Sequence, residues 1–368
     1  MRLLSLTLEQ FRSYGKLEVN FKESERITML MGENATGKTN ILEAIAILAH
    51  LKSPRKVDDE DMIQWEKSHY RIQGRCRTDA GEERSLEVVS QMEPRKTRAA
   101  FINDVRTPAQ RYIGALPLIT FTPDDLLLWN GAPSERRRLV DLLLCQVSAS
   151  YLQTLMEYEK SLRQRNSLLK QIKAGTQNPS SLDPWDEKLA TLGAVITIDR
   201  LQLFETLQLT IRRELTALGE RPKETLFRYV RKTQSPEETS LREELMAELL
   251  QNRERDVLIT ATSIGPHRDD WTLIVDGHDV ATSASRGQQR AALLACLLLE
   301  ASFLELRTGE KPILLLDDVF SELDEAHRSA VLKRLSDHQV IMSAVELDAD
   351  LRKKAHILSC PLVLSPKS

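Results

Sequence analysis

The spacing of apolar residues along the chain predicts strands towards both ends and helices in the middle. Leu4, Leu6 and Leu8 alternate with polar residues, which is typical of a strand with one buried face. Short apolar runs bounded by charged or turn-forming residues predict further strands. The predicted strands lie within residues 1–35 and at 70–76, 85–90, 100–103, 117–121, 273–275, 312–316 and 339–342.

The middle of the chain has the periodicity of helices. Between 134 and 173, apolar residues recur three and four positions apart, and a second such run extends from about 185 to 218. A polar loop near 175–181 separates the two runs, so we expect an antiparallel helical hairpin. A charged stretch with proline at 221–238 and a helix near 240–255 complete this region.

The predicted organisation is an α/β fold in which residues 1–120 and 256–368 form one lobe and residues 121–255 form an inserted helical lobe. The length of 368 residues favours two lobes, because one compact core seldom holds so many. No apolar run reaches the ~18 residues that suggest a membrane span, and the N-terminus lacks the apolar core of a signal peptide. The four cysteines are far apart and form no C-x-x-C pair, which suits a reducing compartment. We therefore expect a cytoplasmic protein without a membrane partner.

A glycine-rich motif joins a predicted strand to a predicted helix near the N-terminus. Residues 32–39, GENATGKT, fit G-x-x-x-x-G-K-[ST], the phosphate-binding P-loop. Glycines let the backbone wrap phosphates, Lys38 can reach the β- and γ-phosphates, and the Thr39 hydroxyl can ligate Mg²⁺. The sequence therefore predicts an ATP site. Its expected residues are Gly32, Glu33, Asn34, Ala35, Thr36, Gly37, Lys38, Thr39 and Asn40.

The predicted strand at 312–316 runs into two carboxylates, Asp317 and Asp318. This is the form of a Walker B motif, whose first carboxylate holds Mg²⁺. We therefore assign Thr39 and Asp317 to the metal. Asp318 stands where many ATPases have a catalytic glutamate, so it is predicted to be catalytic together with Lys38. Alone, the two carboxylates would be better explained as an acidic turn, but a P-loop upstream favours the ATP site.

Residues 285–290, SRGQQR, open an apolar helix upstream of the Walker B strand. Ser285 fits an N-cap, and a serine, a glycine and glutamines at a helix start make a site for an anion. The segment is similar to the signature motif of ABC-type ATPases, with Arg286 in place of the usual first glycine. The predicted signature residues are Ser285, Gly287 and Gln288, and Ser321 and Asp324 are similar to the D-loop that follows Walker B in those proteins.

Further stretches carry a more specific resemblance. They are LTLEQFRSY at 6–14, FTPDDL at 121–126, GAPSERRR at 131–138 with Asp141, GPHRDD at 265–270, and the SRGQQR and LDDVFSELD segments. In this order they resemble RecF, a bacterial family of SMC-like ATPases of recombinational DNA repair. The resemblance implies an ABC-type P-loop ATPase head with an inserted helical lobe, and it adds Arg12 to the expected ATP-binding residues.

The same resemblance implies how such a protein works. Two chains would form an ATP-dependent homodimer, with nucleotide held between the P-loop of one chain and the signature helix of the other. Double- and single-stranded DNA, particularly at gaps and junctions, would be the ligand, and RecR- and RecO-like mediators would be partners in loading recombinase. ATP turnover is expected to be slow and to act as a release timer, because Asp318 is one methylene shorter than glutamate.

The chain departs from the family pattern at three places. Ala35 stands where a P-loop glycine is common, and an alanine fits there if its φ is negative. The strand after the D-loop ends in Ser343 and Ala344 without a switch histidine. No glutamine is evident at 121–126 for a Q-loop, where Asp124 or Asp125 could stand in.

Clusters of basic residues are candidates for DNA contact. Arg136, Arg137 and Arg138 form the densest run, and Arg163, Arg165, Lys170 and Lys173 lie on the helical hairpin. A solvated helix face is the simpler explanation of such runs. The net charge of −3 does not decide between them, because summed charge does not report distribution. His267 and Arg268 fit either a structural role or contact with DNA or nucleotide.

Two other classes share a P-loop and remain as alternatives. An ABC transporter subunit would have a shorter helical lobe and membrane partners, and a small-metabolite kinase would need an acceptor pocket and no signature helix. Neither class explains the RRR and GPHRDD stretches.

Overall fold

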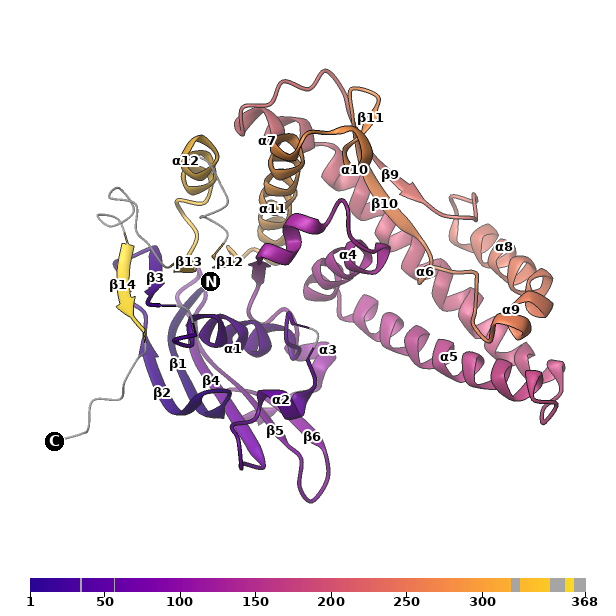
Figure 1. Cartoon of the computed structure of the whole chain (residues 1–368), viewed down its shortest axis with the longest axis horizontal. Helices are drawn as coiled ribbons and strands as arrows, with labels where there is room; N and C mark the ends of the chain where they lie inside the picture. Colours follow the sequence, from indigo (N-terminus) through magenta and orange to yellow (C-terminus); the bar gives the residue numbers. More distant parts are fainter. Residues whose placement is uncertain (34, 56, 319–324, 345–354, 361–368) are drawn as a thin grey trace. The chain divides into compact units, whose positions relative to one another are not determined.

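A computed structural model describes the whole chain except residues 34, 56, 319–324, 345–354 and 361–368 (Figure 1). The described chain divides into two compact units. The first unit consists of Met1–Leu126, Ala217–Glu220 and Ala291–Ser368, and the second of Leu127–Thr216 and Arg221–Arg290. The predicted lobe boundary at 255 differs from this division, because β10 (Asp270–Val275) pairs with β9 (Thr225–Val230) inside the second unit.

The first unit contains two β-sheets. Strands β2-β1-β4-β5-β6-β7 form a six-stranded antiparallel sheet, and β14-β3-β13-β12-β8 form a five-stranded sheet in which every pairing is parallel. Their bounds are β1 Arg2–Phe11, β2 Tyr14–Asn20, β3 Ile27–Met31, β4 His69–Arg77, β5 Glu83–Gln91, β6 Thr97–Ile102, β7 Val105–Arg106, β8 Leu118–Phe121, β12 Ile313–Asp317, β13 Val340–Ala344 and β14 Ala355–Ser359.

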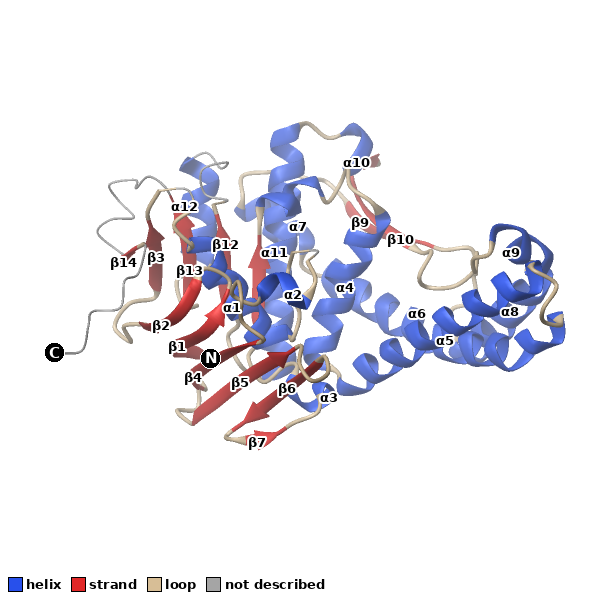
Figure 2. Ribbon diagram, turned by 60° about the horizontal axis from the view of Figure 1, so that its bottom comes forward, coloured by secondary structure: helices blue, strands red, loops and turns tan. Residues whose placement is uncertain are grey.

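Helix α1 (Lys38–His50) lies between these two sheets and contacts strands of both (Figure 2). Its residues from Ile41 to His50 are all buried, so this helix is apolar on nearly every side. A helix that is buried all round is expected where sheets cover two of its faces. The remaining helices of this unit are α2 (Asp59–Met62), α3 (Ala109–Tyr112), α12 (Glu325–Arg334) and most of α11 (Arg286–Thr308).

The second unit is mainly helical. Its long helices α5 (Ala149–Lys173) and α6 (Asp183–Gln208) pack side by side, as predicted for the hairpin, and α8 (Glu238–Gln251) packs on α6 (Figures 1 and 2). The shorter elements are α4 (Pro133–Val147), α7 (Ile211–Ala217), α9 (Arg253–Ile259), α10 (Val280–Ser283), β11 (His278–Asp279) and the single turn η2 (Pro179–Leu182). A further turn, η1 (Pro123–Leu127), belongs to the first unit except for its last residue. Strands β11, β10 and β9 form a small antiparallel sheet.

One expectation for this region was wrong, and one strand was missed. The run at 134–173 is two helices, because Ser148 leaves the helical conformation and its side chain accepts a hydrogen bond from the Tyr151 amide at the start of α5. The charged stretch at 221–238 contains β9, whose alternate residues Leu226, Arg228 and Val230 are exposed. Leu226 and Val230 on the exposed face break the alternation of apolar and polar residues by which a half-buried strand is recognised.

Candidate nucleotide-binding site

The P-loop connects β3, an inner strand of the parallel sheet, to the N-terminus of α1. Lys38 is buried, and its ammonium group donates to the carbonyl oxygens of Gly32 and Glu33 at 2.5 and 2.9 Å. Gly37 has φ 97°, and a Cβ at this position would overlap the Tyr14 hydroxyl. The loop therefore curls around its own lysine, and glycine is required where it passes Tyr14.

Ala35 does not have the negative φ on which its fit to the loop was predicted to depend. Its φ is 66°, in the left-handed region, and the residue is exposed. A Cβ in this region is close to the following carbonyl oxygen, at a cost of about 1–2 kcal/mol, which glycine avoids. The alanine is therefore accommodated with strain.

The Walker B carboxylates lie beside the P-loop helix. The Thr39 hydroxyl is 3.2 Å from Asp317 Oδ1, although the two residues are far apart in sequence. Asp317 ends β12, and Asp318 follows it, exposed and with φ 50°. Ser343, on the neighbouring strand β13, donates to Asp317 Oδ1 at 2.7 Å and accepts a hydrogen bond from the Asp318 amide at 2.9 Å.

These groups fit a nucleotide with Mg²⁺. The cradle of the P-loop holds a buried ammonium group at its centre, and a hydroxyl and a carboxylate already lie within hydrogen-bond distance of each other. Oxygen ligands of this kind, from one or two protein groups, are what Mg²⁺ takes when it is shared with phosphates. Lys38 and the loop backbone would hold the phosphates, and Thr39 and Asp317 would hold the metal.

Arg12, which the resemblance adds to the ATP-binding residues, is tied to the P-loop helix. Its Nε and Nη2 donate to the Glu43 carboxylate at 3.0 and 2.8 Å, and its Nη1 donates to the Asp61 carbonyl oxygen at 2.6 Å. Glu43 is buried on α1, so the ion pair holds the β1–β2 turn against the P-loop helix. Asn40, in the first turn of the same helix, does the same, because its amide donates to the Ser13 hydroxyl at 3.1 Å.

The predicted signature residues lie in the second unit at the exposed start of α11. Ser285 caps the helix as predicted, since its hydroxyl accepts from the Gln288 amide at 3.3 Å, and the Gln288 side chain accepts from the Ser285 amide at 3.0 Å. This reciprocal arrangement is a capping box. A Cβ on Gly287 would meet only the Ser285 hydroxyl, at 3.9 Å, so packing among the described residues does not require glycine there.

The helix start is also held firmly in place. The Trp129 indole donates to the Gln289 carbonyl oxygen at 2.9 Å, and the Gln289 side chain donates to the carbonyl oxygens of Val280 and Ala281. Trp129 is itself buried edge-on against Trp271. Sequence reasoning missed Trp129, which belongs to no motif, and gave Gln289 no role beyond its place in the SRGQQR segment.

The structure does not support DNA contact by the first two arginines of the run at 136–138. Arg136 is buried and forms a two-pronged ion pair with Asp270, both bonds being 2.7 Å. Arg137 donates to the Asp269 carbonyl oxygen at 2.6 Å. Arg138 is half-exposed and lies 4.0 Å from Glu135. The run therefore serves mainly to hold α4 on β10.

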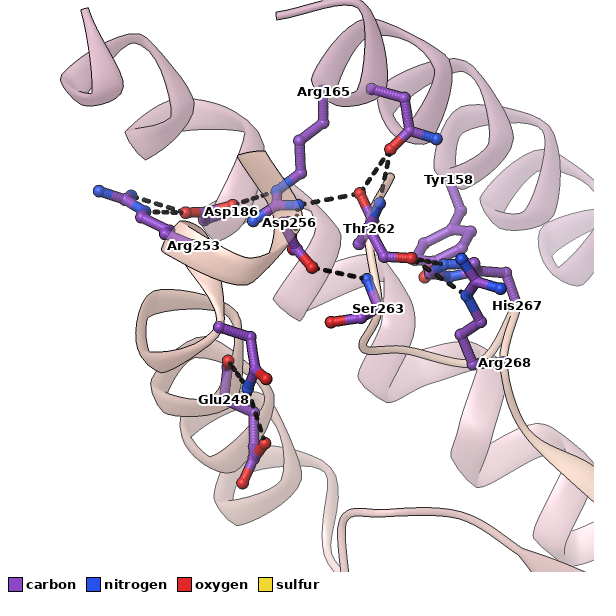
Figure 3. A network of polar contacts seen from close by, with 12 residues as sticks. Tyr158, Arg165, Asp186, Glu248, Arg253, Asp256, Thr262, Ser263, His267 and Arg268 are labelled. Atoms are coloured by element: carbon purple, nitrogen blue, oxygen red, sulfur yellow. Dashed lines mark hydrogen bonds and ion pairs between the residues drawn. The ribbon is translucent and has the colours of Figure 1, made fainter. Parts of the chain in front are cut away.

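The GPHRDD stretch has a structural role. His267 lies between the Tyr158 hydroxyl, at 2.7 Å, and the Thr262 carbonyl oxygen, at 3.0 Å, and Arg268 donates to the same carbonyl (Figure 3). Burial lowers the pKa of His267 to about 4, so the imidazole is neutral at pH 7. These bonds join α5 to the segment that leads into β10.

Arg165, a candidate for DNA contact on sequence grounds, is fully buried. It pairs with Asp186 at 2.5 Å and with Asp256 at 2.7 Å, and it donates to the Thr262 hydroxyl at 2.9 Å (Figure 3). Arg253 binds the other side of Asp186. DNA contact by Arg165 is excluded by this burial.

Three predicted residues, Asn34, Ser321 and Asp324, lie outside the described part of the chain. Of the two aspartates considered for a Q-loop role, Asp125 accepts hydrogen bonds from the Thr122 amide and hydroxyl at 2.7 and 2.9 Å. It therefore closes its own turn, and Asp124 is the exposed one.

Comparison with known proteins first defines the class. The chain matches the model of the RecF/RecN/SMC N-terminal domain over residues 2–355. An SMC head solved in complex with the C-terminal winged-helix domain of ScpA superposes with a TM-score of 0.54 at 13% identity, covering 98% of this chain and 94% of that one. The fold is thus the ABC-type ATPase head of SMC proteins.

Two further similarities define the family. The chain is 37% identical over 336 residues to the DNA replication and repair protein RecF of Geobacillus thermodenitrificans, covering 90% of this chain and 89% of that protein. It is 32% identical to RecF of Natranaerobius thermophilus, with 97% and 96% covered. A solved structure of RecF with ATP, described as a recombination mediator of the RecFOR pathway, superposes with a TM-score of 0.86 at 30% identity, with 95% and 93% covered. The chain belongs to the RecF family.

These relatives are DNA replication and repair proteins, which does not favour the transporter-subunit alternative. Among the described helices, none combines the length and the hydropathy needed to cross a bilayer.

Proposed function

We propose that this chain is an ATP-dependent DNA-binding protein of recombinational repair and replication restart, in which slow ATP hydrolysis times release from DNA. One observation carries the proposal. The Lys38 ammonium group lies inside the P-loop, and the next residue, Thr39, is within hydrogen-bond distance of Asp317. A RecF structure that contains ATP, similar over most of the chain, supports the nucleotide.

Each residue of the site has its own role in binding or hydrolysing ATP. Lys38 and the P-loop amides bind the terminal phosphates, and Thr39 and Asp317 hold Mg²⁺. Bound Mg²⁺ neutralises charge on the β- and γ-phosphates. Asp318 orients the attacking water and accepts its proton. Aspartate is a methylene shorter than the glutamate common at this position, and misplacement by about 1 Å can cost ~100-fold in rate. Turnover is therefore slow.

ATP drives formation of a homodimer in this proposal. The N-terminus of α11, with Ser285, Gly287 and Gln288, binds the nucleotide held by the second copy. Two features of the described residues support this role. All three residues are exposed. Packing within the described chain does not explain why residue 287 is glycine, because a Cβ there would have room. A helix start without bulky side chains gives an anion close access to backbone N–H groups.

The dimer binds DNA at gaps and junctions, and RecR- and RecO-like mediators act with it in loading recombinase. Similarity to a recombination mediator of the RecFOR pathway supports these ligands and partners. Contacts to DNA are expected to be mainly to phosphates, which position a protein on DNA without reading sequence.

Titration of a fluorescent ATP analogue into the full chain and into Lys38→Ala tests the nucleotide site. The substitution removes the one cation aimed at the phosphates, so binding should fall by at least tenfold. Lys52→Ala, which removes a lysine just beyond the end of α1, is the matched control and should bind normally. Unchanged binding by Lys38→Ala would exclude the assignment of the P-loop.

The timer is tested separately with Asp318→Asn. This variant should bind ATP, turn it over more slowly than the unmodified chain, and hold the ATP-bound dimer on DNA for longer. If turnover is unchanged, Asp318 is not the catalytic carboxylate. If turnover falls and the lifetime on DNA does not lengthen, hydrolysis does not time release.

A further inference from the structure

The strand that separates the P-loop strand from the Walker B strand carries a serine at its end. In the parallel sheet β13 lies between β3 and β12, and its Ser343 is in register with Leu30 of β3 and with Asp317 of β12. Ser343 is 3% exposed. In the sequence this position stands out only because it lacks the switch histidine of many ABC-type ATPases.

The Ser343 hydroxyl makes two hydrogen bonds that join the Walker B residues to each other. A hydroxyl has one proton, and here it is donated to Asp317 Oδ1 at 2.7 Å, so the oxygen is left to accept the Asp318 amide at 2.9 Å. One side chain thus fixes both the carboxylate of Asp317 and the main chain from which the Asp318 carboxylate extends.

The local geometry makes this contact consequential. Asp318 has φ 50°, in the left-handed region, which aspartate adopts more readily than most residues but still at a cost that contacts such as this one offset. Asp317 Oδ1 also lies 3.2 Å from the Thr39 hydroxyl. Thr39 and Ser343 both donate to this oxygen. The Thr39 hydroxyl is assigned to the metal, whereas the Ser343 hydroxyl can hold Asp317 whether or not the metal is bound.

We propose that Ser343 is a positioning residue that couples the metal-binding carboxylate, Asp317, to the catalytic carboxylate, Asp318. The inference rests on the proposed ATPase function of the same site. It predicts that Ser343 affects two quantities together: the extent to which Mg²⁺ tightens nucleotide binding, and the rate of hydrolysis. Binding of nucleotide without Mg²⁺ depends on Lys38 and the loop backbone, and it should not depend on Ser343.

The test compares Ser343→Ala, Ser343→Cys and Ser343→Thr in the full chain. Affinity for a fluorescent ATP analogue is measured with Mg²⁺ and with EDTA, and turnover is measured in parallel. Alanine removes the hydroxyl, and cysteine keeps the volume with a much weaker donor. Both should bind the analogue in EDTA within about twofold of the unmodified chain, while the tightening by Mg²⁺ falls about tenfold, as for loss of a hydrogen bond to a charged group. Turnover should fall tenfold or more.

Threonine keeps the hydroxyl and is favoured in a strand, so Ser343→Thr should restore both quantities. Ser359→Ala is the matched control, because Ser359 ends β14 at the same end of the sheet and is exposed. In an Asp318→Asn background, Ser343→Ala should reduce turnover little further, since the group that it positions is already removed.

The inference is overturned if Ser343→Ala and Ser343→Cys keep normal tightening by Mg²⁺ and normal turnover, or if threonine restores neither. It is also overturned if the loss is undiminished in the Asp318→Asn background. Lys38→Ala separates this failure from failure of the proposed function: if Lys38→Ala loses nucleotide while the Ser343 variants behave normally, the ATP site stands and the role of Ser343 does not.

Discussion

Replacing Arg165 by methionine should destabilise the second unit far more than replacing an exposed arginine on the same helix. Arg165 has no exposed surface, and neither do its two partners, Asp186 and Asp256 (Figure 3). Methionine fills much of the volume and carries no charge. The substitution therefore tests the charge of this cluster more than its packing.

The structure indicates which buried carboxylate would lose its cation in the Arg165→Met variant. Asp186 would keep its ion pair with Arg253, at 2.6 Å. Within the described part of the chain, the Asp256 carboxylate would keep the hydrogen bond from the Ser263 amide, at 3.0 Å, and would have no cation beside it. Stranding a buried charge costs about 3–5 kcal/mol. Arg163, two residues earlier, is 70% exposed and lies 3.7 Å from Glu159, so its loss should cost less than about 0.5 kcal/mol.

Urea unfolding followed by tryptophan fluorescence measures the difference. Three of the four tryptophans, Trp129, Trp185 and Trp271, belong to the second unit, and the fourth, Trp65, is 87% exposed and should change little. For a slope near 2 kcal/mol per molar urea, Arg165→Met should lower the midpoint by about 2 M, and Arg163→Ala by less than about 0.3 M.

Adding Asp256→Asn to Arg165→Met removes the stranded charge and should recover more than half of the lost midpoint. The reasoning is refuted if Arg165→Met and Arg163→Ala shift the midpoint equally, or if Asp256→Asn makes the double variant worse. Either result would mean that the buried charge of Asp256 is compensated in some other way.

Three other predictions concern the nucleotide and DNA. Ala35→Gly should tighten binding of an ATP analogue by up to about fivefold, because glycine adopts the observed φ of 66° without strain; weaker binding would show that bound nucleotide does not use this φ. Ser285→Arg should leave ATP binding by the monomer intact and abolish ATP-dependent dimers in light scattering, whereas loss of binding by the monomer would contradict a site between two chains. DNA affinity should fall at least about tenfold between 50 and 200 mM salt in a fluorescence-anisotropy titration, since phosphate contacts release counterions; a flat response or a strong preference for one base sequence would contradict it.

The sequence could predict those parts of the molecule that depend on residues close together in the chain. The P-loop, the Walker B strand and the Ser285 cap each follow from residue types at fixed spacing next to a strand or a helix. The strand β9 had no such spacing, because its exposed face carries Leu226, Arg228 and Val230 among charged neighbours. Only its pairing with β10 makes it a strand.

Long-range contacts determine the surroundings of several basic residues, and the sequence does not reveal them. Arg12, Arg136 and Arg165 look alike in sequence, as cations near polar segments, yet each is committed to a carboxylate distant along the chain. Nothing local distinguishes a buried arginine from one that is free to bind phosphate. The same holds for Ser343, whose role depends on the strand order that brings it beside Asp317.

The backbone conformation of the P-loop was the other feature that the sequence could not predict. The fit of Ala35 to the P-loop depended on the sign of its φ, which the residue type alone suggested would be negative. The structure places it at 66°, where the loop closes around Lys38. A loop that must point several carbonyl and amide groups inward constrains φ more strongly than the preference of one alanine.

Sedimentation velocity of the full chain, with and without ATP and with gapped DNA, tests the central claim most directly. The proposed function predicts a monomer without nucleotide, a dimer with ATP and Mg²⁺, and a dimer that co-sediments with gapped DNA only when ATP is present. Lys38→Ala should remain a monomer throughout. A chain that binds ATP and stays monomeric on gapped DNA would contradict the proposal that ATP acts by joining two copies.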